Sequence, residues 1–356
     1  RLRPSVQPEQ PRPLFHVAGK RDQVVHFSNQ ETAIEVAIEV NAVGNARTRC
    51  GKGCTVYGPS TPAPVMTWIH AGAHVYPHGM LDPWFKQAYP FKHLKKAIYW
   101  KLNETHLLRN AESVLFTCEE ERRLAQDTFN PYRCIEKVAP LGIEPPVGNP
   151  VHQEQVFLQK HPDLEKKGFL LFLGRIHEKK GLDLLLEALG RLPRPLPPLV
   201  VAGPADSPSY IDKLKKMEAN LVRRQGNSKV IWTGMLKGDE KWGALRTAEA
   251  FILPSHQENF GIAVVEALSV GTPVLLSRKV NIWREIIEDN AGIAGADTVQ
   301  DTLGTLQQWQ GLDDEARAQM GSNASQCFAR RFEISKAAEH LIRVLQRRDE
   351  AYPRQA

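Results

Sequence analysis

The stretch Phe169-Leu-Leu-Phe-Leu173, followed by Gly174-Arg-Ile-His-Glu-Lys-Lys-Gly181 and Leu182-Asp-Leu-Leu-Leu-Glu-Ala-Leu189, decides the fold class. It predicts a short buried strand, a basic loop and an amphipathic helix over 182–192. The alternation continues downstream, with strand-like runs at 199–202, 230–232, 251–253 and 274–276 and helix-like stretches at 210–224, 239–248 and 262–270. Repeated strand and helix units predict an α/β fold with a parallel sheet covered on both faces. Two more helical patterns follow, at 314–331 and 334–348.

Upstream of residue 168 the pattern is less regular. Strand candidates lie at 14–17, 24–27 and 113–117, and helix-like stretches lie at 31–43, 95–109 and 119–129. The segment 141–150 is rich in Pro and Gly, which is typical of an interdomain linker. Because 356 residues at roughly 100–200 per domain allow two domains, we predict a boundary there, with domains 1–145 and 146–356. Residues 1–64 are the least informative part.

Composition and charge exclude some classes without choosing a function. Hydrophobic residues make up 42% and charged residues 24%, as in a globular protein with a full core, so disorder over the whole length is excluded. The net charge of +6 is compatible with anionic substrates, phosphates or an acidic membrane surface. No apolar run approaches the ~18 residues of a membrane span.

The cysteine count and the first residues bear on localisation. Five cysteines, an odd number, fit a reducing cytoplasm better than a disulfide scaffold. Residues 1–13 hold no apolar signal-peptide core, and the missing initiator Met suggests a fragment. We therefore expect a cytoplasmic protein.

Two cysteines and two histidines raise the question of a metal site. Cys50 and Cys54, with three residues between them, could supply half of a metal site, and His70 and His74 the rest. The segment between them lacks the apolar pattern of a zinc finger. A free cysteine pair in a loop is the favoured interpretation, and no metal site is predicted.

Two loops that follow predicted strands carry polar groups suited to a ligand, because ligands of open parallel sheets bind beyond the carboxyl ends of the strands. The first, Gly174 to Gly181, offers a guanidinium, ammonium groups and a helix start, which suit a diphosphate but also describe an ordinary solvated loop. The second, Pro254 to Gly261, precedes an apolar helix whose only charge is Glu266. A carboxylate buried there needs donors such as backbone amides or ligand hydroxyls, and a purely structural acid is the alternative.

These residues resemble a known family. Glu258-x7-Glu266, with Pro-Ser before it and Ala-Leu-Ser-Val-Gly-Thr-Pro-Val after it, is similar to the signature of the group-one (family-four) retaining glycosyltransferases of the GT-B fold. Gly174-Arg175 with Lys180-Gly181 resembles the family's second motif, at the expected upstream position. The resemblance covers about residues 77–348. It implies two Rossmann-like domains facing across a cleft, with the last helix returning to the first domain.

The resemblance also implies roles for single residues. Arg175 and Lys180, beside Gly174, would hold the donor diphosphate, Glu266 the ribose hydroxyls and Glu258 the donor sugar. The backbone of Asn259, Phe260, Gly261 and Ile262 would assist the phosphates, and the base would lie near Gly234 and Met235. His78, in Pro77-His-Gly-Met80, resembles the element that faces the sugar. The catalytic set is thus Glu258, His78, Arg175 and Lys180.

The donor would be a UDP- or GDP-linked sugar and the acceptor a saccharide or a lipid-linked molecule, as in cell-envelope polysaccharide or glycolipid synthesis. No Asp-x-Asp motif occurs, which agrees with diphosphate stabilisation by cations and with no required metal or cofactor.

The first domain departs from the family pattern. The strand candidate at 14–17 leads into Ala18-Gly-Lys20 without a Gly-Gly turn, and the part before residue 141 is short. We therefore expect a first domain that is truncated or diverged. A non-catalytic nucleotide-sugar-binding protein is the alternative to an enzyme, and an epimerase on the same fold is disfavoured.

Residues Trp84 to Arg109 combine lysines with aromatic residues at helical spacing. This combination suits an anionic membrane interface, on the inner face of the cell membrane. Aromatic residues packed inside the first domain, with solvated lysines, are an equally weighted interpretation. Nucleic acid is disfavoured because no binding module is recognisable.

Overall fold

A computed structural model describes residues 14–19, 47–51, 54–57, 65–70 and 74–346, except 165, 167, 194, 227 and 228. The chain divides into two compact units. Unit 1 comprises residues within 1–77, 89–116 and 129–137, and unit 2 comprises residues within 78–88, 117–128 and 138–356. The predicted strand at 24–27 and the helix-like stretch at 31–43 lie outside the described residues. The predicted domain boundary at residue 145 stays a prediction.

Unit 2 is built on a six-stranded parallel sheet. Its strands, in spatial order, are β10 (Val230–Gly234), β9 (Leu199–Ala202), β8 (Leu170–Leu173), β11 (Ala250–Leu253), β12 (Val274–Ser277) and β13 (Gly292–Gly295). The five predicted strands are present, whereas β13 was not predicted. The chain runs from β8 outward to β10 and then returns to β11, so the strand order reverses between β8 and β11. Such a switch point leaves room for a ligand where the two following loops diverge.

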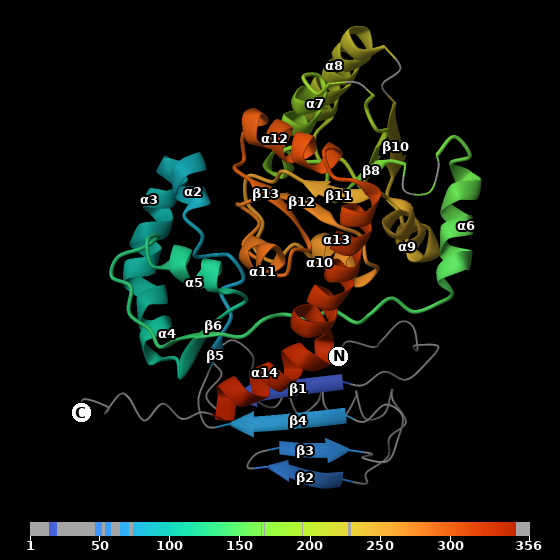
Figure 1. Ribbon diagram of the computed structural model, residues 1–356. Helices are drawn as coiled ribbons and strands as arrows, with labels where there is room; N and C mark the ends of the chain where they lie inside the picture. The colour runs from blue at the N-terminus through green and yellow to red at the C-terminus, as the bar shows by residue number, and fades with distance from the viewer. Residues whose placement is uncertain are drawn as a thin grey trace. The chain divides into compact units, whose positions relative to one another are not determined.

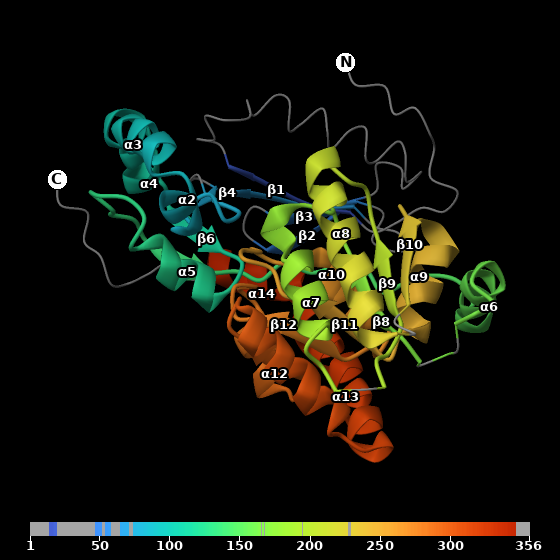
Figure 2. The same ribbon diagram turned by 90° about the horizontal axis from the view of Figure 1, so that it is seen from above.

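Helices cover both faces of this sheet, as predicted. Figures 1 and 2 show α7 (Leu182–Leu189), α8 (Pro208–Gln225) and α12 (Val299–Gln310) on one side, and α9 (Gly238–Thr247), α10 (Ile262–Ser269) and α13 (Asp314–Cys327) on the other. Further helices are α6 (Pro150–Lys160), α11 (Trp283–Glu288) and α14 (Ile334–Gln346). The prediction of one helix over 314–331 was too simple, because a π-helical turn at Phe328–Phe332 follows α13.

The inner strands β9, β8, β11 and β12 are apolar because both of their faces are buried, whereas the edge strand β10 is only partly buried. Phe169, Phe172 and Phe251 are fully buried between the helical layers. Burial of a large apolar side chain stabilises the fold by about 1.5–3 kcal/mol. This core fixes the carboxyl edge of the sheet, from which the loops of the site emerge.

Unit 1 holds two smaller sheets. The first has the order β1 (Leu14–Gly19), β4 (Val65–His70), β3 (Cys54–Tyr57) and β2 (Arg47–Gly51). Strands β1 and β4 are parallel, and β3 is antiparallel to both of its neighbours. The second sheet has the order β5 (His74–Val75), β6 (Ser113–Phe116) and β7 (Glu136–Val138), and only the last residue of β7 is assigned to unit 2.

The helix predicted over 95–109 is divided into three parts. Helix α3 (Pro90–Tyr99) leads into a π-helical turn at Trp100–Glu104 and then into α4 (Thr105–Asn110). Trp100 anchors this turn, because it is buried, stacks on Phe129 with ring centroids 4.6 Å apart and donates from Nε1 to the carbonyl of Pro131 at 2.8 Å. Among the described residues, no helix combines the length and the hydropathy that crossing a bilayer requires.

Candidate functional site

The candidate site is formed where the carboxyl ends of β8 and β11 meet. The two strands pair in parallel, with Leu170 beside Ala250 and Leu171 beside Phe251. The loops that leave them, 174–181 and 254–261, therefore start side by side at the switch point. The structure thus brings together the two segments that the sequence singled out.

Close backbone contact joins the two loops. The backbone N–H of His256 and the hydroxyl of Ser255 both donate to the carbonyl oxygen of Lys179, at 2.8 and 2.9 Å. Gly181 has a φ of +69°, and a Cβ placed there would lie 2.1 Å from the carbonyl oxygen of Pro254. Only glycine fits this position, because any side chain would push the two loops apart.

A cation and a carboxylate face each other across this contact. The ammonium of Lys180 forms an ion pair with Glu258, and the side chains are only 17% and 21% exposed. Burial and repulsion from the neighbouring Lys179 and Arg175 lower the pKa of Lys180 to about 8. Arg175 is largely exposed and lies 3.3 Å from the carboxylate of Asp206. The loop after β8 therefore concentrates positive charge, with Glu258 beside Lys180 and Asp206 beside Arg175.

The second glutamate of the signature also has a partner. Glu266 lies in α10 and is 15% exposed, and its Oε1 lies 2.7 Å from Nζ of Lys241 on α9. The expectation that its carboxylate needs a donor is met by an ammonium, which the sequence analysis did not foresee. Lys241 also lies over the ring of Trp242, 4.2 Å from the centroid.

Helix α10 begins directly after the second loop. Gly261 has a φ of +72° and precedes the first helical residue, Ile262, whose side chain is 59% exposed. Phe260 is buried and packs edge-on against Phe332 at 5.9 Å, so only its backbone is available to a ligand. The first N–H groups of a helix lack intrahelical partners and carry partial positive charge.

Three glycines align across the carboxyl edge of the sheet. The N–H of Gly174 donates to the carbonyl of Ala202, and the N–H of Gly203 donates to the carbonyl of Gly234. A Cβ on Gly203 would lie 1.8 Å from the carbonyl oxygen of Gly174. Met235, directly after β10, is 56% exposed. The edge beside the basic loop is thus free of side chains at these strand ends.

His78 belongs to unit 2 and lies in a tight turn beside the second loop. His78 and Gly79 both have positive φ, 46° and 76°. Gly79 touches Asn259, because a Cβ placed on it would be 3.0 Å from the Asn259 Cβ. The structure therefore places His78 next to the loop that carries Glu258.

Sequence reasoning missed several polar residues around this turn. Asp82 is buried, and its carboxylate accepts from the N–H of Trp84 at 2.8 Å and from Nε2 of Gln257 at 3.2 Å. Glu121 of α5 (Glu119–Ala125) accepts from the N–H of Gly79 at 2.6 Å. The pattern Cys118-x-x-Glu121 is a weak sequence signal for a helix cap, but nothing in the local sequence indicates the partner 42 residues away.

Of the four candidate metal residues, only His74 has its side chain among the described residues. No group of three or more His, Cys, Asp and Glu side chains that could hold a metal occurs there. The side chains of Cys50, Cys54 and His70 lie outside the described ones. Nδ1 of His74 lies 2.7 Å from the hydroxyl of Ser113.

The basic and aromatic segment 84–109 contributes both buried and exposed rings. Trp100 is buried, as described above. In α3, by contrast, Phe91, Leu94 and Ile98 are 88%, 62% and 57% exposed. The apolar side chains of this segment are therefore not all packed inside the domain, and the membrane interface stays a prediction.

The chain is similar to known proteins in both sequence and fold. Residues 153–327 match the family described as "Glycosyl transferases group 1". The chain is 32% identical over 130 residues to a sulfoquinovosyl transferase of Arabidopsis thaliana, a match that covers 36% of this chain and 23% of the relative. The chain therefore spans about a quarter of the length of this curated relative.

Two solved structures share the fold. That of Alr3699/HepE of Anabaena, in complex with UDP and glucose, matches with a TM-score of 0.60 at 17% identity, over 77% of this chain and 71% of that one. That of WaaG, a glycosyltransferase involved in lipopolysaccharide biosynthesis, matches with a TM-score of 0.52 at 20% identity, over 66% and 62%. At these identities the likeness concerns the fold alone.

Proposed function

Because this chain belongs to the group 1 glycosyl transferases of the GT-B fold, we propose that it transfers a sugar from a nucleoside-diphosphate sugar to an acceptor hydroxyl, with retention of configuration. The observation that carries the proposal is the pairing of Lys180 with Glu258 at the switch point, beside the start of α10. The ammonium would bind the diphosphate of a donor, and the carboxylate would accept hydrogen bonds from its sugar hydroxyls.

The residues suit the parts of such a donor. Lys180, Arg175 and the first N–H groups of α10, with Gly174 leaving space at the strand end, would bind the diphosphate. Glu266 would accept from the ribose hydroxyls with its second oxygen while Lys241 holds the first. The base would rest on Gly234 and Met235, whose surfaces are exposed beyond β10.

The same cations would act on the reaction. When the bond between the anomeric carbon and the phosphate oxygen breaks, negative charge grows on the departing diphosphate, and Lys180 and Arg175 stabilise that charge. Glu258 and His78 orient the sugar while the acceptor oxygen bonds to the anomeric carbon and the hydroxyl proton passes to the departing diphosphate oxygen. Donor binding must first separate Lys180 from Glu258, so that the ammonium turns to phosphate and the carboxylate to sugar hydroxyls.

Thermal melting with UDP, GDP and their sugars tests the proposal. We expect one nucleotide to raise the melting temperature, and Lys180→Ala or Glu266→Ala to abolish the increase. Lys216→Ala, on the exposed side of α8, is the matched control and keeps it. No increase with any of these nucleotides would refute the proposal. Donor hydrolysis or transfer by the purified protein separates an enzyme from a protein that only binds nucleotide sugars.

For the acceptor side, we propose a saccharide or lipid-linked acceptor of cell-envelope assembly, reached from an anionic membrane surface on the cytoplasmic side. The named structural relative WaaG acts in lipopolysaccharide biosynthesis. The support within this chain is α3, where Phe91, Leu94 and Ile98 recur at helical spacing and are exposed. Lys92 and Lys95 flank this stripe. An exposed apolar stripe edged by lysines suits the boundary between lipid headgroups and acyl chains.

Sedimentation with vesicles tests this surface separately from donor binding. Vesicles with anionic lipid should bind the protein at low salt, and neutral vesicles should not. Exchange of Lys92, Lys95 and Lys96 for Glu should release it. The same charge change at Lys216, Arg223 and Arg224 on α8 is the matched control. Equal binding by both triple variants would remove the membrane proposal and leave the donor site untouched.

A further inference from the structure

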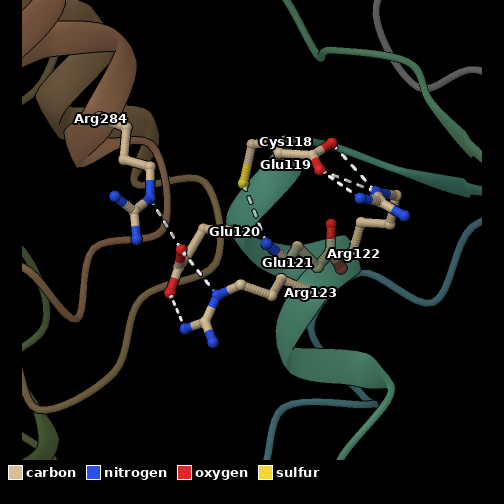
Figure 3. Close-up of polar contacts among 7 residues, drawn as sticks. All are labelled: Cys118, Glu119, Glu120, Glu121, Arg122, Arg123 and Arg284. Carbon is tan, nitrogen blue, oxygen red and sulfur yellow. Dashed lines mark hydrogen bonds and ion pairs between the residues drawn. The ribbon is translucent and has the colours of Figure 1, made fainter.

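Glu121 is a buried carboxylate with an unusual set of partners. Its side chain is 2% exposed, and among the described residues it forms no ion pair. Its neighbours on α5 behave differently: Glu119 is paired with Arg122, and Glu120 with Arg123 and Arg284 (Figure 3). A carboxylate buried in this way is tolerated only where hydrogen-bond donors satisfy it.

One oxygen of Glu121 serves the start of its own helix. Oε2 accepts from the N–H and the hydroxyl of Thr117, both at 2.7 Å. The N–H of Glu121 in turn donates to Sγ of Cys118 at 3.4 Å. This resembles a capping box and by itself indicates a purely structural role.

The other oxygen leaves the helix. Oε1 accepts from the N–H of Gly79 at 2.6 Å, and this bond holds a turn in which His78 and Gly79 both have positive φ. A residue other than glycine with positive φ is strained unless its surroundings fix it. The bond to Glu121 is one contact that fixes the turn carrying His78.

The same network reaches the loop of Glu258. Nδ2 of Asn259 lies 3.4 Å from the Thr117 hydroxyl, and Oδ1 of Asn259 lies 3.3 Å from Nδ2 of Asn281. Asn259 also packs against Gly79, as described above. Glu121 and Thr117 therefore tie the His78 turn to the loop that follows β11.

We propose that Glu121 is a positioning residue that sets His78 at the sugar end of the donor site, an inference that rests on the proposed function. The two carboxylate oxygens take three N–H and O–H donors. A glutamine has the same shape but only one acceptor oxygen, so its amide N–H₂ would face a donor of either Gly79 or Thr117. Glu121→Gln should therefore loosen the turn without emptying the space.

The first experiment compares binding of UDP alone with binding of the UDP-sugar found by screening, by titration calorimetry. The residues proposed to bind the phosphates and the ribose, Lys180, Arg175 and Glu266, do not contact Glu121. We therefore expect Glu121→Gln to leave the Kd of UDP within about twofold, to abolish the extra affinity given by the sugar, and to lower kcat at least tenfold. Glu120→Gln, the adjacent residue whose partners are arginines, is the matched control and should change each quantity less than twofold.

The second experiment asks whether Glu121 acts through His78. If it does, adding Glu121→Gln to His78→Ala should lower kcat by no more than about twofold beyond His78→Ala alone. Gly79→Ala, which strains the same turn with the carboxylate intact, should reproduce the loss of sugar affinity. Gly79→Ala keeps the test valid if Glu121→Gln lowers the melting temperature so far that this variant cannot be assayed.

The outcomes separate the inference from its premise. A wild-type protein that binds no nucleotide overturns the proposed function and this inference with it. If the wild-type protein binds and transfers, three results would overturn the inference alone. Glu121→Gln could leave affinity and kcat unchanged, or it could weaken the binding of UDP and of the UDP-sugar equally. Its effect on kcat could also add in full to that of His78→Ala.

Discussion

Raising the pH from 7 to 9 is expected to weaken UDP binding by about tenfold, because the Lys180 ammonium loses its proton across this range. Burial and the charges of Lys179 and Arg175 lower the pKa of Lys180 to about 8. At that pKa roughly nine tenths of the side chains are charged at pH 7 and one tenth at pH 9. The phosphates of UDP are already ionised above pH 7. If only the charged form of Lys180 supports diphosphate binding, the affinity for UDP falls in proportion to the charged fraction of Lys180.

The stability of the unliganded protein should move in the opposite direction. The folded pKa of Lys180 lies below the ordinary lysine value of 10.5, so the unfolded chain binds more protons between about pH 8 and 10.5. This group's contribution to the free energy of unfolding therefore rises with pH through that window and is lost as the pH falls through 8. Weaker ligand binding at pH 9 thus does not arise from unfolding at Lys180.

Titration calorimetry at constant ionic strength measures the effect. Lys180→Arg keeps its charge over the whole range, so its affinity should not depend on pH. Lys180→Met should bind UDP weakly at both pH values. Lys216→Met should show the same fall in UDP affinity between pH 7 and 9 as the wild type. A tenfold fall that persists in Lys180→Met, or a flat wild-type profile, would refute the reasoning.

Four further outcomes are expected from the packing of the site and its surroundings. Gly203→Ala should destabilise the fold by about 3 kcal/mol in denaturant unfolding, because a Cβ there collides with a carbonyl oxygen 1.8 Å away. Gly304→Ala in α12, where a Cβ meets no atom within 4 Å, should instead stabilise by roughly 0.5–1 kcal/mol. Glu266→Gln should weaken UDP binding at least tenfold and 2′,3′-dideoxy-UDP binding much less, which a competition assay distinguishes. Cys118 should resist iodoacetamide in the native protein and react after unfolding, as mapped by mass spectrometry, because burial raises the pKa of its thiol to about 12.

The sequence predicts most of the large sheet because each strand is apolar on both faces and flanked by Gly or Pro. The strand at 251–253 and the helix at 262–270 lie within one residue of β11 and α10. Strand β13 escaped prediction because its sequence, Gly292-Ile-Ala-Gly295, has little strand propensity. Gly292 is required there, since a Cβ would lie 2.1 Å from the carbonyl oxygen of Val274. That requirement becomes visible only when the neighbouring strand is in place.

The candidate site, like the sheet, could be predicted from the sequence only in part. Motif residues such as Lys180 and Glu258 lie in loops that directly follow predicted strands, and the sequence places them near each other. Lys241 and Glu121 were missed because their partners are distant in the chain, 25 residues for Glu266 and 42 for Gly79. Local periodicity carries no information on such pairs. The roles of the site residues remain proposals.

The contact between Gly181 and Pro254 has a consequence for engineering. Because no side chain separates the two loops there, a change of backbone path in one displaces the other. Donor specificity therefore cannot be exchanged between relatives by grafting one loop at a time. Residues 174–181 and 254–261 form a single transplantable cassette, and libraries aimed at new donors should vary both segments together while leaving this glycine fixed.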